Sequence, residues 1–247
     1  MNTRLLGRGV ATLTVTAGLG LAGSMAVDAA AAPTPAPSAS PTPAPHTIAL
    51  VTLKAHCNVA VQRRLATLAA DNTFLKDSAA VSNSDRAALE GQTSADQQGL
   101  TALDKTIQND TTHQQTWADC QTIVSGYRVY VLEDPKIHEV IAADGVTKVD
   151  ATFATLISEL QALINNSSVS ATVKAQAQAE LNDLTSKVDA AQTSISGVSS
   201  AVINLTPAGW PGNQVDLKSA AQNINTAHTD LDGAGADANH IIKLLGA

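Results

Sequence analysis

The feature that most constrains this chain is a run of apolar positions spaced alternately three and four residues apart. Near the C-terminus the run passes through Leu217, Ala221, Ile224, His228, Leu231, Gly235, Ala238, Ile242 and Leu245. This spacing places one stripe along a helix and keeps it facing a partner helix over many turns. A β-strand would instead alternate at every second residue. The C-terminal segment is therefore predicted to be a long helix packed lengthwise against another.

Three further segments carry the same spacing. They are Leu181, Leu184, Val188, Ala191, Ile195, Val198, Val202 and Leu205; Ala142, Val146, Val149, Phe153, Leu156, Leu160 and Leu163; and Asn58, Val61, Leu65, Leu68, Asn72 and Leu75. Only 2% of the residues are aromatic, too few for the strands of a β-sandwich. We therefore expect an all-α fold, an elongated antiparallel helical bundle with coiled-coil-like seams. Asn58 and Asn72 would either fix the helix register by pairing with polar partners or lie on partly exposed faces.

Polar caps and breaks divide residues 47–247 into about six helices. The predicted ranges are 47–80, 84–109, 112–133, 136–165, 169–205 and 214–246. Asp134 and Pro135 are read as an N-cap and the first helical residue, and the fifth helix would be about 55 Å long. Short connections make neighbouring helices antiparallel. We expect one helical domain, with two consecutive three-helix units as the alternative.

The first 46 residues have the composition of an export signal followed by a spacer. Arg4 and Arg8 precede an uncharged apolar stretch and then small residues, the pattern of a signal peptide spanning residues 1–31. The apolar stretch is shorter than the roughly 20 residues of a membrane-spanning helix, although a retained anchor is the alternative. Residues 32–46 hold six of the nine prolines and are predicted to be a disordered linker. The mature protein is therefore expected to be extracellular or associated with the cell envelope, without a transmembrane span.

Cys57 and Cys120 are the two cysteines of the chain. A cysteine pair in an exported protein usually forms a disulfide. The bond would tie the first helix to the third and contribute roughly 3–4 kcal/mol by the chain-entropy estimate. The alternatives are two buried free thiols, or a metal site that includes His56 and His113. The spacing of these residues matches no standard set of metal ligands, and we expect no metal or cofactor.

The densest chemistry lies in residues 117–136. Trp117, Tyr127, Arg128 and Tyr130 are a candidate patch for a ligand or partner, in which Tyr127 and Tyr130 would share a helix face. The competing interpretation is an aromatic plug where helices meet, because Trp117, Cys120, Val124, Tyr127 and Val131 also follow the 3-4 spacing.

Known catalytic signatures are missing from the sequence. No phosphate-binding glycine loop and no zinc-protease motif occurs. The carboxylates of Glu133 and Asp134 are adjacent and would point in different directions on a helix, which does not favour acid–base chemistry. The net charge of −7 argues against nucleic-acid binding, which needs a basic face. We therefore expect a protein that is not an enzyme.

One resemblance to known proteins is carried by two segments. YRVYVLEDPK, preceded by DCQTIVSG, and NLTPA at residues 204–208 resemble segments of a loose group of secreted, helix-rich, coiled-coil-like proteins of high-GC Gram-positive bacteria. The group has no assigned activity, so the resemblance implies only secretion and a helical body.

Together these features favour a secreted or cell-surface helical scaffold, spacer or protein-interaction module, whose protein or envelope partner the sequence does not identify. Small residues along the seams bury little apolar area, so we expect a slender rod of modest stability, with self-association into homo-oligomers as a further possibility. The alternative is an extracytoplasmic binding protein that holds a small apolar or aromatic ligand between helices near Tyr127, Tyr130 and Arg128. A cell-wall hydrolase would need a carboxylate pair across a cleft.

Overall fold

The computed structural model describes residues 48–246, which are helical throughout with short connections and contain no strand. The elements are α1 (Leu50–Asp77), α2 (Asn83–Asn109), α3 (His113–Ser125), the π-helix η1 (Val129–Glu133), α4 (Asp134–Asn166), α5 (Ala171–Ile195), α6 (Val198–Ile203), the 3-10 turn η2 (Pro207–Gly209) and α7 (Asn213–Leu245). The predicted all-α class is confirmed. The predicted signal peptide (1–31) and linker (32–46) lie outside the described residues.

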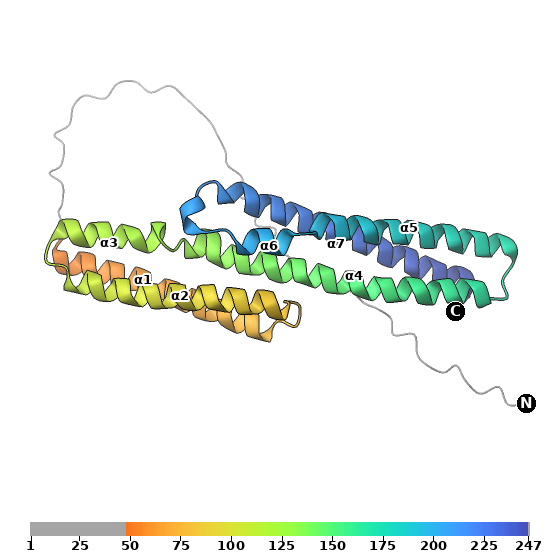
Figure 1. Cartoon of the computed structure of the whole chain (residues 1–247), viewed down its shortest axis with the longest axis horizontal. Coiled ribbons are helices and arrows are strands. Elements are labelled where there is room, and N and C mark those ends of the chain that lie inside the picture. Colours follow the sequence, from red (N-terminus) through yellow and green to blue (C-terminus); the bar gives the residue numbers. More distant parts are fainter. Residues whose placement is uncertain (1–47, 247) are drawn as a thin grey trace, which may run out of the picture. The chain divides into compact units, whose positions relative to one another are not determined.

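The helices from Thr47 onward form one compact unit with two groups of helices (Figure 1). α1, α2 and α3 pack on one another around a small core. That core consists of Leu53, Cys57, Val61, Leu68, Leu100, Ile107, Ile123 and Val129. α4, α5 and α7 pack around a larger core, which also takes in Leu75 of α1, Leu89 of α2 and Val81 of the connection between them. α4 therefore packs within the second group and also contacts α1 of the first. None of the described helices is long and apolar enough to span a membrane.

The interface between α5 and α7 is the most extensive between two helices of the unit. On α5 and α6, the predicted stripe from Leu181 to Val202 is buried at every position. On α7 the buried apolar positions are Ala220, Ile224, Ala227, Leu231, Ala234, Ala238, Ile241 and Leu245. Four of these lie one residue before the predicted positions. The prediction was wrong there because each buried residue adjoins one that could occupy the same stripe, so composition does not mark which of the two faces α5. These neighbours are Ala221, His228, Gly235 and Ile242.

The predicted helix over 112–133 is wrong in its second half. α3 ends at Ser125, and Arg128 adopts a left-handed backbone with φ 46°. The chain then turns through η1 directly into α4 without the predicted break at Asp134. Pro135 has no N–H to donate and would crowd the carbonyl four residues back in an α-helix. The wider π-turn before it is a conformation that accommodates this residue.

The predicted fifth helix over 169–205 is also divided. α5 ends at Ile195, and α6 begins after Gly197, whose φ is 74°. Glycine adopts this left-handed conformation without steric cost, so the chain bends there and the single helix of about 55 Å does not form. Val198 and Val202 remain buried after the bend, so the apolar stripe continues through the break.

Candidate functional site

The junction between α3 and α4 combines an unusual backbone with buried charges. Arg128 has positive φ, which costs a residue other than glycine about 1–2 kcal/mol. Its carbonyl accepts hydrogen bonds from the backbone N–H groups of Val131 (3.1 Å) and Leu132 (2.9 Å), and its guanidinium lies over the ring of Trp210 at 5.3 Å. Backbone strain and π-turns are both concentrated at functional sites in proteins. This junction is therefore a candidate functional site.

A buried ion pair lies at the start of α4. Lys136 and Glu133 are 2% and 3% exposed, and the Lys136 Nζ atom is 2.9 Å from Glu133 Oε2 and 3.1 Å from Oε1. Nζ also donates to Gln92 Oε1 at 3.1 Å, so the ammonium group has three acceptors. Burial raises the pKa of Glu133, while the neighbouring Lys136 lowers it. A lysine this deeply buried is rare unless it is paired, and its partners here hold it between α2 and α4.

An open cleft of about 280 Å³ lies against this ion pair. Its lining residues are Gln92, Ala95, Asp96, Glu133, Lys136, Ile203, Asn204, Leu205, Thr206 and Pro207. Gln92 joins two of its walls, because its side-chain amide donates to the carbonyl of Ile203 at 3.1 Å. Burial raises the pKa of Asp96 to about 6, with Glu133 adding to the rise and Lys136 opposing it. The cleft therefore combines the carboxyl group of Asp96 and the Glu133–Lys136 pair with apolar residues of the segment after α6. Its size and charged groups suit a small group with hydrogen-bond donors.

The four residues of the predicted patch do not line this cleft. Trp117 and Tyr130 are 55% and 45% exposed, and the Arg64 guanidinium lies 4.8 Å from the centre of the Tyr130 ring. Tyr127 is half-buried against Gly99 of α2. Arg128 contacts Trp210 instead. The structure thus gives these residues separate surroundings, and the left-handed backbone at Arg128 ends the helix face that the two tyrosines were predicted to share.

The predicted core positions on α3 are also shifted. Trp117, Val124 and Val131 are exposed, whereas Thr116 and Ile123 are buried. The buried positions fall one residue before the predicted ones. The stripe was predicted from apolar residues, and it therefore passed over the polar Thr116, which lies in the interior. The buried Thr116 hydroxyl keeps a hydrogen bond, because it donates to the Thr112 carbonyl at 3.0 Å.

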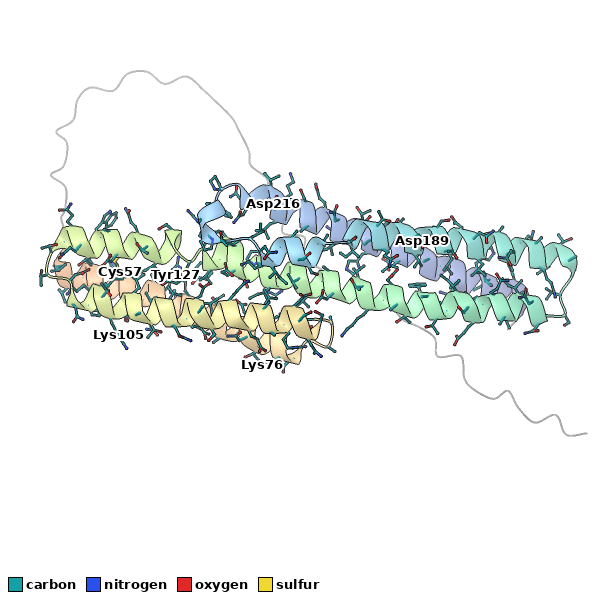
Figure 2. The ribbon with its side chains drawn as sticks, in the orientation of Figure 1. Cys57, Lys76, Lys105, Tyr127, Asp189 and Asp216 are labelled. Carbon is teal, nitrogen blue, oxygen red and sulfur yellow. A yellow bond between two sulfur atoms is a disulfide. The ribbon has the colours of Figure 1, made fainter. Side chains whose placement is uncertain are left out.

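Cys57 and Cys120 form the disulfide predicted between the first and third helices. Their Cα atoms are 5.6 Å apart, and Cys57 lies on α1 beside α3 (Figure 2). The alternative metal site is not assembled, because His56 is exposed and His113 Nε2 lies 2.6 Å from the carbonyl of Ile48. In the predicted seams, Asn58 donates to Asp104 at 2.8 Å and Asn72 accepts from Thr93 at 2.5 Å. Both asparagines are half-buried and pair with polar groups of α2.

Gln92, Asp96 and Lys136 were not predicted from the sequence to belong to a site. Each stands in a polar stretch that resembles the solvent face of a helix. The one available signal was the spacing of Glu133 and Lys136, which are three residues apart and can pair on one helix face. Glu133 pairs with Lys136, whereas Asp134 contacts His138, so the adjacent carboxylates do point in different directions.

Comparison with known proteins finds no significant match to a protein family, to a curated protein or to a solved structure.

Proposed function

We propose that this protein is a secreted or cell-surface helical scaffold or protein-interaction module that does not act as an enzyme. The observation that carries the proposal is the continuous buried stripe along α5, α6 and α7, which packs these helices lengthwise against α4. A body built in this way holds its surfaces at fixed positions, which is the requirement for a spacer or a platform. The close-packed core leaves the helix surfaces available for partners.

The disulfide supports an extracytoplasmic location. Structural disulfides persist in oxidising compartments and are rare in reducing ones. The Cys57–Cys120 bond joins α1 to α3. These helices belong to the smaller of the two groups, whose apolar core is limited. The signal peptide expected over residues 1–31 points to the same compartment.

Fractionation of the producing cell tests the location. The full chain is expected outside the cytoplasm with Cys57 and Cys120 oxidised, as read by thiol labelling and mass spectrometry. A variant that lacks residues 1–31 is expected to stay inside with both thiols labelled. A full-length chain that is cytoplasmic and reduced would contradict the proposed location.

Sedimentation with isolated cell envelopes tests the interaction role. The purified protein is expected to bind envelopes saturably, and the D96N variant is expected to bind equally well because it alters one carboxyl group of the cleft and keeps the buried Glu133–Lys136 pair. An absence of binding would contradict an interaction module at the envelope. Breakdown of envelope material that is lost in D96N would instead identify a hydrolase.

The cleft favours a second candidate, a binding protein for a small ligand. The sequence suggested an apolar or aromatic ligand near Tyr127, Tyr130 and Arg128, but the cleft presents Asp96, Glu133 and Lys136. A ligand with an amine or several hydroxyl groups fits these partners better. A thermal-shift screen of amines and sugars would support this role if a compound raises the Tm of the protein but not that of D96N. A panel without such a compound would leave the scaffold as the better account.

A further inference from the structure

A second group of titratable side chains lies where α1 meets α4, outside the cleft. Asp71 comes from α1, and Asp134 and His138 come from the first turns of α4. Each offers one carboxylate oxygen or ring nitrogen, and these three atoms lie within 4.8 Å of one another. Asp134 and His138 are four residues apart, so they share a helix face, with 3.5 Å between Asp134 Oδ1 and His138 Nε2.

Asp71 is the unusual member of this group. Its side chain is buried, with 5% of the residue exposed. When both carboxyl groups are ionised, its Oδ2 atom has no hydrogen-bond donor among the described residues, and only a proton shared with Asp134 would link the two carboxyl groups. Buried polar atoms without a partner are rare in folded proteins and often mark a missing water or ion. Burial, and next the charge of Asp134, raise the pKa of Asp71 to about 7. The neighbours that face it are two acidic groups, Asp134 and Glu133, and the imidazole of His138.

We propose that Asp71, Asp134 and His138 form a binding site for a divalent transition-metal ion, with Zn²⁺ as the best fit. One imidazole nitrogen and two carboxylate oxygens are ligands that Zn²⁺ accepts in a tetrahedral arrangement, with water in the fourth position. Ligand atoms in such a site are about 3.4 Å apart. The side chains of Asp134 and His138 are partly exposed, so they can rotate to bring the ligand atoms from within 4.8 Å of one another to this shorter spacing. Ca²⁺ and Mg²⁺ prefer a larger, all-oxygen shell.

The imidazole of His138 has an aromatic neighbour. The ring of Phe74, on the same helix as Asp71, has its centre 5.0 Å from the centre of the His138 ring. A metal ion here would give the buried oxygen of Asp71 a partner and remove the repulsion between the two carboxylates. It would also join α1 to α4, adding to the disulfide that joins α1 to α3. The site would therefore strengthen the contact between the two groups of helices.

The test is a titration of the tag-free, metal-stripped protein with Zn²⁺, followed by calorimetry and by thermal unfolding. We expect one Zn²⁺ per chain and a Tm that rises by about 5–10 °C at a free Zn²⁺ concentration 100 times the Kd. The variants D71N and H138A are each expected to weaken binding at least tenfold. Circular dichroism checks that both variants remain helical, and the exposed position of His138 makes H138A the safer of the two.

The matched control is H240A. His240 also faces a carboxylate across a helix interface, at 3.1 Å from Glu180, but this pair is not part of a three-ligand cluster. H240A should bind Zn²⁺ like the unaltered protein. The proposal is overturned if the protein binds no Zn²⁺, if binding survives both D71N and H138A, or if H240A weakens it as much as H138A does. Ca²⁺ binding that is lost in D71N but kept in H138A would also overturn it, because the imidazole would not be a ligand.

Discussion

At the scale of single residues, Asp96 of α2 makes the stability of this protein depend on pH. The Glu133–Lys136 pair makes it depend on both members of an ion pair. Because the pKa of Asp96 is raised to about 6, the folded state favours its protonated form. The associated stability is complete below about pH 4 and is lost as the pH rises through 6. D96N should therefore leave stability unchanged near pH 4 and increase it by up to about 3 kcal/mol at pH 7.5, because each pKa unit corresponds to about 1.4 kcal/mol. Urea unfolding at both pH values measures this, with D232N at an exposed position of α7 as the control; equal effects of the two variants would contradict the account.

Lys136 provides a second prediction at this scale. K136M removes the cation and leaves the Glu133 carboxylate buried without its partner, so stability at pH 7 should fall by about 3–5 kcal/mol. The double variant E133Q/K136M removes both charges and should recover a large part of the loss. Chemical unfolding of the two single variants and the double variant forms a thermodynamic cycle. Additive effects would show that Glu133 and Lys136 do not stabilise one another.

At the scale of secondary-structure elements, two glycines in open surroundings should respond oppositely to the same substitution. Gly197 has φ 74° and Gly91 lies within α2, and an added Cβ would meet nothing within 4 Å at either position. G197A should destabilise by about 1–2 kcal/mol because alanine disfavours this backbone. G91A should stabilise by about 0.5–1 kcal/mol because alanine favours the helix. Thermal unfolding distinguishes the two; a stabilising G197A would mean that α5 and α6 can form one straight helix.

The elements also show how far the sequence could predict the structure. The stripe from Leu181 to Val202 was predictable because large aliphatic residues stand out from polar neighbours. On α7 only Ile224, Leu231, Ala238 and Leu245 were placed correctly, since at the other four turns the buried residue adjoins one that could equally face the core. The bend at Gly197 and the turn at Arg128 depend on backbone conformations that the apolar spacing does not encode. The charges of the cleft were missed because Asp96 and Lys136 are buried only by tertiary contacts with α2, α4 and the segment after α6.

At the scale of the whole molecule, the disulfide is expected to carry a large share of the stability of α1, α2 and α3. C57A/C120A should lower the free energy of unfolding by roughly 3–4 kcal/mol, because the closed loop restricts the unfolded chain. A reducing agent should destabilise the unaltered protein to a similar extent and have no effect on the variant. Guanidinium unfolding with and without the reductant measures both. A reductant effect on the variant would show that the loss does not come from this bond.

The scaffold proposal depends most directly on the lengthwise, antiparallel packing of α5 against α7. Glu180 and His240 face one another across this interface at 3.1 Å, so the double variant E180C/H240C should form a second disulfide under mild oxidation, identified by mass spectrometry. His228 lies about 18 Å further along the same helix, and E180C/H228C should not crosslink within the chain. Crosslinking of E180C/H240C alone is the predicted result. Efficient crosslinking of E180C/H228C, or none in E180C/H240C, would contradict the packing on which the proposed function rests.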